Sequence, residues 1–241
     1  MKIDVALIPE EFQSKTQHAN NVVVIDVLRA SSSIITALGH GACGIIPAAS
    51  KQEALEIGRR QKEKNVLYCG EKDGLKIQGF NLGNSPKEYK KETVHGKTLI
   101  FVSTNGSRMM VKTVQERRPL FIAGFLNVSA AATRISKSDR NCLLACSGRE
   151  GRYSLEDTVC AGMLAFEIQK ASRNAPVLSD EARSAIVLYR HFADDLPGMA
   201  RNSLHGRYLS SLGLGEDIPT CVSLNRFKTV PIFKRGALCL D

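Results

Sequence analysis

The 241-residue sequence contains no tryptophan, and only 6% of its residues are aromatic. Its 33 Lys and Arg residues exceed its 24 Asp and Glu residues, which gives a net charge of +9. A nucleic-acid-binding protein of this charge usually carries dense basic runs interleaved with aromatic side chains, a pattern that is missing here. We therefore expect no nucleic-acid partner and interpret the basic charge as steering small anionic molecules.

Long apolar segments and paired cysteines are missing as well. No apolar run approaches the roughly 20 residues that a membrane-spanning helix needs, and residues 1–11 are too short and too acidic for a signal peptide. The seven cysteines are odd in number, lie mostly in apolar runs and form no CxxC pair. This usage argues against a disulfide framework and a structural zinc site. We expect a cytoplasmic protein with reduced thiols and no membrane partner.

Apolar segments rich in Val and Ile alternate with helical patterns along most of the chain. The strand patterns cover residues 2–8, 22–28, 44–47, 66–69, 98–103, 120–123 and 143–146. The helical patterns cover residues 31–38, 51–62, 107–115, 128–136, 156–170, 181–192 and 200–212. Such alternation is typical of an α/β fold with a mainly parallel sheet and helices on both faces. We predict a core of residues 1–171 and a smaller α/β C-terminal part, residues 172–241, which could form a second subdomain.

Three predicted strands end in small hydrogen-bonding residues that lead into a helix, at residues 28–33, 103–108 and 146–149. In an open parallel sheet, ligands bind beyond the carboxyl ends of the strands, where helix N-termini favour anions. Arg29 and Arg108 could add bidentate contacts to phosphate or sulfonate oxygens. One such junction is usually only a helix cap, but three in one chain indicate an anion pocket. The backbone of Thr104, Asn105 and Gly106 would form part of it.

Carboxylates follow the same strand ends. Asp26 lies in a strand otherwise made of Val and Ile, where an unpaired ionised group would be costly. With Glu71 and Asp157, it could hold one Mg²⁺ whose shell is completed by water and phosphate oxygens. The structural alternatives are a buried salt bridge between Asp26 and Arg29, and a capping box in which Ser154 caps the helix that contains Asp157.

A long polar loop of Gly and Asn residues spans residues 79–86. It is either a plain connection or a loop folded over a ligand. We predict the second role and assign Asn84 and Ser85 to the substrate site. The histidines fall in none of the strand-end junctions, so the sequence gives no support to a histidine phosphatase. They are His18, His40, His95, His191 and His205.

Five segments of the sequence resemble the 2-phosphosulfolactate phosphatase family. They are VVIDVLRASSSI, GEKDGLKIQGFNLGNSP, FVSTNGSRMM, AGFLNVSAAA and CSGREGRYSLEDTVCAG. The resemblance implies an α/β fold of its own and Mg²⁺-dependent hydrolysis of 2-phospho-3-sulfolactate to 3-sulfolactate and phosphate, within coenzyme M biosynthesis. Asn81 stands where the family commonly has Asp, which puts any metal or proton role of that position in doubt.

Carried onto this chain, the family motifs point to Asp26, Arg29, Glu71, Asn84, Asn105, Arg108, Cys146, Glu156 and Asp157. From the strand-end residues and the family motifs together, we assign Asp26, Arg29 and Glu156 as catalytic residues. The substrate-binding assignments are Asn84, Ser85, Thr104, Asn105, Gly106, Arg108 and Cys146. The metal assignments are Asp26, Glu71 and Asp157.

Two other functions fit parts of the sequence. Cys146 and Arg152 have the C-x₅-R spacing of a cysteine phosphatase, whose loop activates a thiolate and binds phosphate on backbone N–H groups. Against this mechanism, Glu150 would repel the phosphate, and Ala145 stands where such enzymes have His. A non-catalytic binder of a small anionic metabolite is the other alternative, although acids clustered beside an anion pocket are costly without a metal or proton role. We expect a Mg²⁺-dependent phosphatase of a small anionic phosphoester, and leave homo-oligomer formation open.

Overall fold

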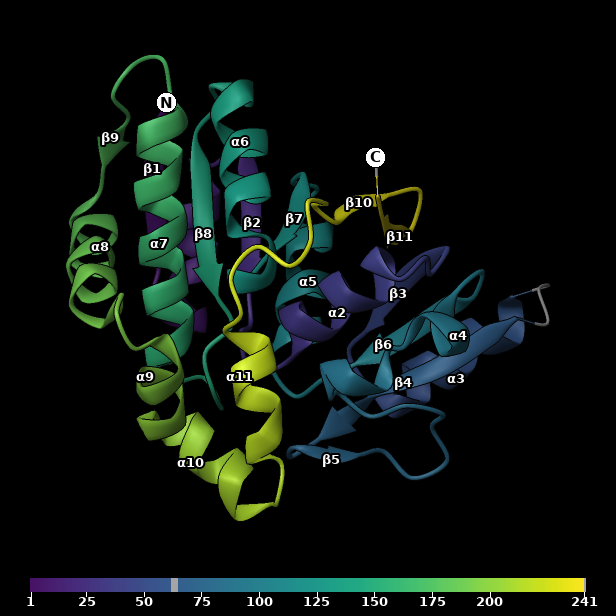
Figure 1. The fold of residues 1–241 in the computed structure, drawn as a ribbon. Coiled ribbons are helices and arrows are strands. Elements are labelled where there is room, and N and C mark those ends of the chain that lie inside the picture. Colours follow the sequence, from purple (N-terminus) through teal and green to yellow (C-terminus); the bar gives the residue numbers. More distant parts are fainter. Residues whose placement is uncertain (62–64, 241) are drawn as a thin grey trace.

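The computed structural model describes residues 1–61 and 65–240 (Figure 1). Its strands are β1 (Lys2–Ala6), β2 (Asn21–Ile25), β3 (Gly44–Ala48), β4 (Val66–Lys72), β5 (Leu75–Lys76), β6 (Thr98–Val102), β7 (Leu120–Ala123), β8 (Cys142–Cys146), β9 (Val177–Leu178), β10 (Ile232–Lys234) and β11 (Ala237–Cys239). Its α-helices are α1 (Phe12–Thr16), α2 (Ala30–Gly39), α3 (Lys51–Arg60), α4 (Lys91–Val94), α5 (Gly106–Gln115), α6 (Val128–Ser138), α7 (Leu155–Ala171), α8 (Asp180–Phe192), α9 (Leu196–Asn202), α10 (Leu204–Ser211) and α11 (Ile218–Cys221). Short 3₁₀ helices are η1 (Pro9–Glu11), η2 (Pro86–Glu88), η3 (Phe125–Asn127) and η4 (Gly215–Asp217).

The strands of the described residues form one sheet in the order β5-β4-β6-β3-β11-β10-β7-β2-β8-β1-β9. One half, β4-β6-β3, is internally parallel, and so is the other half, from β7 to β9. The C-terminal hairpin β10-β11 lies between them and is antiparallel to both β7 and β3. The predicted α/β fold with a mainly parallel sheet is confirmed.

Both faces of the sheet are covered by helices, which explains the unbroken apolar strands. Along β2, Val23 and Ile25 pack into one core cluster with residues of α6 and α7, whereas Val22 and Val24 pack into another with residues of α2 and α5 (Figure 1). Successive side chains of a strand point to opposite faces, so a strand buried on both faces must be apolar throughout. This is the physical origin of the Val and Ile runs.

Two helix predictions change in the structure. The helix predicted over residues 200–212 is divided into α9 and α10, because the Ser203 side chain caps α10 by accepting from the Gly206 N–H. The helix predicted over residues 51–62 ends at Arg60, and Lys62 lies outside the described residues. The division near residue 171 stays a prediction, but β10 and β11 join the same sheet as the N-terminal strands.

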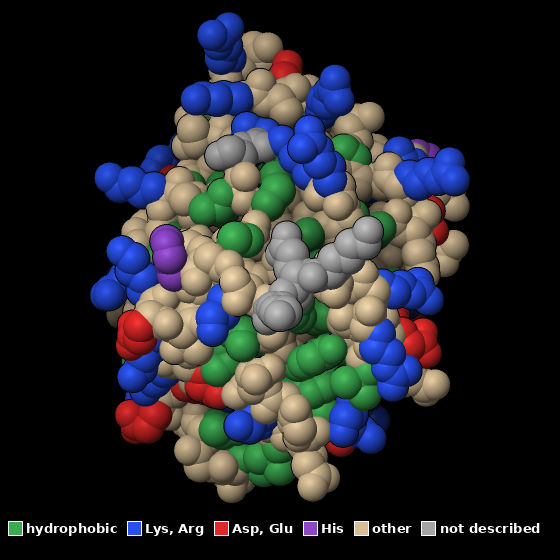
Figure 2. Space-filling view, turned by 90° about the vertical axis from the view of Figure 1, so that its right-hand side faces the viewer, with side chains coloured by type: hydrophobic (Ala, Val, Ile, Leu, Met, Phe, Trp, Pro, Cys, Tyr) green, Lys and Arg blue, Asp and Glu red, His purple; other side chains and the backbone are tan. Residues whose placement is uncertain are grey.

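The surface carries the excess positive charge as separate side chains on the face that Figure 2 draws, with apolar and polar groups between them. In the described part of the chain, no helix combines the length and apolar character that crossing a bilayer requires.

Candidate active site

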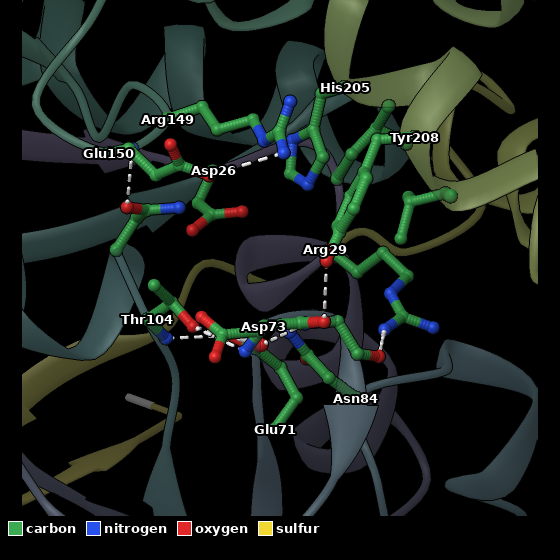
Figure 3. Close-up of a pocket in the computed structure, with 14 residues that line it drawn as sticks. Asp26, Arg29, Glu71, Asp73, Asn84, Thr104, Arg149, Glu150, His205 and Tyr208 are labelled. Atoms are coloured by element: carbon green, nitrogen blue, oxygen red, sulfur yellow. Dashed lines mark hydrogen bonds and ion pairs between the residues drawn. The ribbon is translucent and has the colours of Figure 1, made fainter. Parts of the chain in front are cut away.

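A pocket lies where the segments after β2, β4, β6 and β8 meet helix α10 (Figure 3). In that view, Arg149 and His205 lie on one side of it and Glu71 and Thr104 on the other. It is lined by Asp26, Leu28, Arg29, Glu71, Asp73, Gly74, Asn84, Thr104, Asn105, Arg149, Glu150, His205, Tyr208 and Leu209. Both halves of the sheet and the C-terminal helices therefore contribute to one site.

Asp26 is held at the pocket by the first turn of α2. It directly follows β2, its N–H donates to Ser31 Oγ at 2.9 Å, and its Oδ1 accepts from the Ala30 N–H at 3.1 Å. Gly106, the first residue of α5, packs against the same carboxylate: a β-carbon there would come within 2.5 Å of Asp26 Oδ2. The absence of a side chain at Gly106 thus lets the N-terminus of a second helix approach Asp26.

Other acidic side chains surround Asp26. Burial raises the pKa of Asp26 to about 6; the His205 ring and the Ala30 N–H oppose this rise, whereas the Glu71 and Glu156 carboxylates add to it. Ionisation of Asp26 at neutral pH therefore places negative charge where water compensates it poorly. A cation or a proton-transfer role would give this arrangement a function.

Arg29 is fixed by residues distant in the sequence. Its Nη1 donates to Asp217 Oδ2 at 2.7 Å and its Nη2 donates to the Gly74 carbonyl at 2.6 Å. The other oxygen of Asp217 accepts from Ser85 Oγ at 2.6 Å. The alternative salt bridge between Asp26 and Arg29 is wrong, because the partner of Arg29 is Asp217. Arg29 lines the pocket, as predicted, with its guanidinium already oriented.

Glu71 joins the segment after β4 to the segment after β6. Its Oε1 accepts from the Thr104 N–H at 2.6 Å, and its Oε2 accepts from Thr104 Oγ1 at 3.0 Å and from the Gly74 N–H at 2.7 Å. Both carboxylate oxygens are therefore used in holding two loops at the pocket wall.

Asp157 has a similar role beside β2 and β8. Its Oδ1 accepts from the Val27 N–H at 2.8 Å, and its Oδ2 accepts from the Gly148 N–H at 3.2 Å. Ser154 Oγ accepts from the Asp157 N–H at 3.3 Å, so the predicted cap of α7 is confirmed. Burial, with the nearby charges of Glu156 and Asp26, raises the pKa of Asp157 well above its ordinary value.

The predicted metal ligands are not assembled into a cage. Within residues 1–61 and 65–240, no group of three or more His, Cys, Asp and Glu side chains is arranged to hold a metal ion. Two oxygens of pocket-lining residues nevertheless lack a hydrogen-bond donor. In the described part of the chain Asp26 Oδ2 accepts no hydrogen bond, and buried Asn84 Oδ1 has no partner. Mg²⁺ commonly uses only one or two carboxylates and fills its shell with water and phosphate. A site with an unpaired carboxylate oxygen, that of Asp26, fits this way of binding Mg²⁺.

The structure brings three of the predicted substrate-binding residues to the pocket: Asn84, Thr104 and Asn105. Arg108 is different, because its side chain is exposed on α5 and lines a neighbouring groove with Lys51 and Lys76. Ser85 contributes through its bond to Asp217, and Gly106 packs behind Asp26. We correct the assignment of Arg108 accordingly: it lines the neighbouring groove, which shares Glu71, Asp73 and Thr104 with the pocket, and not the pocket itself.

Cys146 is not at the pocket either. It is the last residue of β8, its side chain is fully buried, and burial, followed by the charge of Asp157, raises its pKa well above the ordinary value. A nucleophilic cysteine needs a lowered pKa and access to substrate, whereas Arg152 is exposed. The prediction that Cys146 binds substrate and the cysteine-phosphatase alternative are both contradicted by this geometry.

Several residues that line the pocket were not predicted from the sequence. His205 and Tyr208 come from α10, and Arg149 stacks on the Tyr208 ring with its guanidinium carbon 4.2 Å from the ring centre. Arg149 belongs to the strand-end segment of residues 146–149 that the sequence had indicated. In contrast, nothing in the pattern of residues 200–212 distinguishes His205 and Tyr208 from the surface residues of an ordinary helix. Only the packing of α10 over the strand ends identifies them.

The chain is similar to proteins of one family. The family model described as 2-phosphosulpholactate phosphatase matches residues 6–236. A relative from Thermotoga maritima, named "Probable 2-phosphosulfolactate phosphatase", is 42% identical over 218 residues, 90% of this chain and 91% of that protein. A relative of the same name from Clostridium beijerinckii is 33% identical over 241 residues, the full length of both. The match extends the resemblance of residues 22–162 to nearly the whole chain, which therefore belongs to the 2-phosphosulpholactate phosphatase family.

Proposed function

We propose that this protein is a phosphatase that hydrolyses 2-phospho-3-sulfolactate to 3-sulfolactate and phosphate. The observation that carries the proposal is the pocket around Asp26, where buried acidic and guanidinium groups meet at the strand ends of a chain in this family. The family supports a small phosphoester as the substrate class. A place in coenzyme M formation rests on the family alone, and a cytoplasmic location rests on the sequence prediction alone.

The pocket offers several groups to an anion. The ten-residue helices α2 and α5 both begin at it, and helix N-termini favour negative charge. Arg29 and Arg149 place guanidinium groups on its wall, oriented by ion pairs with Asp217 and Glu150. One phosphate alone does not need this number of donors, which supports a substrate with a second anionic group such as a sulfonate or carboxylate. Charge that develops on the phosphoryl oxygens would be stabilised by the same groups.

We further propose that the activity depends on Mg²⁺. When bound, the ion would polarise the phosphoryl group as a Lewis acid. Asp26 is the predicted ligand with an open oxygen, whereas Glu71 and Asp157 would first have to give up backbone hydrogen bonds. Asn84 lines the same pocket, and its buried amide oxygen has no hydrogen-bond partner, which would suit an ordered water.

The proposal is tested by measuring phosphate release from a panel of small phosphoesters, each with Mg²⁺ and with excess EDTA. Phosphosulfolactate should be the preferred substrate, above a phosphoester whose remainder is uncharged, and EDTA should abolish release until Mg²⁺ is restored. Full activity in EDTA would contradict the metal proposal alone. No phosphate release from any member of the panel would reject the phosphatase proposal and favour a binding protein.

A further inference from the structure

His205 lines the pocket from α10, and its imidazole projects into the pocket in Figure 3. Its Nδ1 lies 3.1 Å from Glu156 Oε1 of α7. The His205 side chain is 15% exposed, whereas that of Glu156 is 1% exposed. The ring can therefore meet a bound molecule while its partner carboxylate is sealed inside the protein.

The contact with His205 stabilises the ionised form of Glu156. Burial alone would raise the pKa of Glu156, but the hydrogen bond and charge of His205 outweigh it and leave the pKa below its ordinary value. An ionised Glu156 accepts from Nδ1–H and leaves Nε2 as the nitrogen that can exchange a proton with a ligand. His205 also lines a second, adjoining pocket together with Glu156. The charged groups that share either pocket with the ring are the acids Asp26, Glu71, Asp73, Glu150 and Glu156 and the bases Arg29, Arg149, Arg152 and Arg207.

The reaction proposed above has a specific need that this pair can meet. Hydrolysis of an alkyl phosphate expels an alkoxide, which is a poor leaving group unless it is protonated as it departs. Asp26 is the ligand proposed above for Mg²⁺, and Cys146 is fully buried and does not line the pocket, so the partly exposed imidazole is better placed for this role.

We propose that His205 is the general acid that protonates the ester oxygen, and that Glu156 is a positioning residue that orients its ring. The inference rests on the proposed phosphatase function. A water oxygen forms a bond to phosphorus, and the bond between phosphorus and the ester oxygen breaks with its electron pair remaining on that oxygen. The proton on Nε2 moves to the ester oxygen. The attacking water releases one proton to solvent, from which the imidazole regains its own, so one water is consumed and no electrons are gained or lost.

The experiment compares two substrates whose leaving groups differ. Phosphosulfolactate needs a protonated leaving group, whereas 2,4-dinitrophenyl phosphate releases a stable phenolate without a proton. His205→Gln should lower kcat for the first by about a hundredfold or more and for the second by less than about tenfold. We expect kcat of the wild type to fall on the alkaline side of its pH profile, and this fall should be absent in the variant. Glu156→Gln should lower kcat for the alkyl ester by about tenfold and shift the same limb of the profile.

His191→Gln is the matched control, because His191 is exposed on α8 and away from the pocket. Equal losses on both substrates for His205→Gln, with an unchanged pH profile, would mean a merely structural role and overturn the inference. If the variant does not fold, the wild type decides: the alkaline limb must be present with the alkyl ester and absent with the dinitrophenyl ester. A wild type that hydrolyses neither ester would reject the proposed function together with this inference, whereas the preceding outcomes reject the inference alone.

Discussion

Arg29 Nη1 lies 2.7 Å from Asp217 Oδ2, although the two residues are 188 positions apart in the chain. Both side chains are almost completely buried, with 3% and 6% exposure. This ion pair ties the segment between α10 and α11 to the junction of β2 and α2. Since Ser85 also donates to Asp217, a single carboxylate connects the polar loop of residues 79–86 to the C-terminal part of the chain.

Asp217→Ala should destabilise the protein strongly, because it leaves the Arg29 guanidinium buried without its charge partner. We expect the free energy of unfolding to fall by about 3–5 kcal/mol, measured by urea denaturation. Asp194→Ala, at an exposed position, should change it by less than about 0.5 kcal/mol. A loss at Asp217 below about 1 kcal/mol would show that water replaces the pair.

Asp26→Asn should raise the stability of the metal-free protein above pH 6 while it removes activity. The pKa of Asp26 is raised from 3.8 to about 6, so the folded state binds this proton more tightly than the unfolded state. The wild type therefore loses stability as pH rises through about 4 to 6, and the variant does not. We expect the variant to be more stable at pH 7.5 by as much as about 3 kcal/mol, and equal near pH 4.

The response to Mg²⁺ is a second measurement on the Asp26→Asn variant. Added Mg²⁺ should raise the Tm of the wild type at pH 7.5 and not that of Asp26→Asn, and kcat of the variant should fall by about a hundredfold or more. Asp73→Asn is the matched control, since Asp73 lines the same pocket but is exposed. A variant that is less stable than the wild type at pH 7.5 contradicts the assigned environment of Asp26.

Cys146→Ser should fold and retain kcat within a few-fold of the wild type, because the thiol is buried at the end of β8 and does not line the pocket. The buried hydroxyl should cost about 1–3 kcal/mol of stability, measured by thermal unfolding. Brief treatment of the native wild type with iodoacetamide should modify exposed Cys43 and leave Cys146 and the activity intact, as read by mass spectrometry. Loss of activity that tracks alkylation of Cys146 would restore the cysteine-phosphatase mechanism.

Arg149→Ala should raise KM for phosphosulfolactate by about tenfold, as expected for the loss of one charge-assisted contact. The guanidinium of Arg149 lies at the pocket on the Tyr208 ring. Arg108→Ala should change KM by less than about twofold, since that side chain lines the neighbouring groove. The reverse order of the two effects, measured by initial-rate kinetics, would return Arg108 to the substrate site.

Local chemistry in the sequence was sufficient to predict seven strands, β1 to β4 and β6 to β8, and much of one wall of the pocket. A strand buried on both faces must be apolar along its length, so β2 and β8 were visible as runs of apolar residues. Asp26 was conspicuous for the same reason, because a carboxylate inside such a run needs a partner, although the structure ends β2 one residue before it. The small residues at the strand ends likewise marked where α2 and α5 begin, and with them Thr104 and Asn105.

What the tertiary structure decided was which distant residues complete the site. The pattern of residues 200–212 and the short apolar pieces after residue 218 contain no signal of their partners. The placement of β10 and β11 within the sheet, the pairing of Asp217 with Arg29 and the contact of His205 with Glu156 are long-range contacts. Local periodicity reports only which face of an element is apolar. Which side chains then meet is set by how helices and strands pack, and so Arg108 lines the neighbouring groove while His205 lines the pocket.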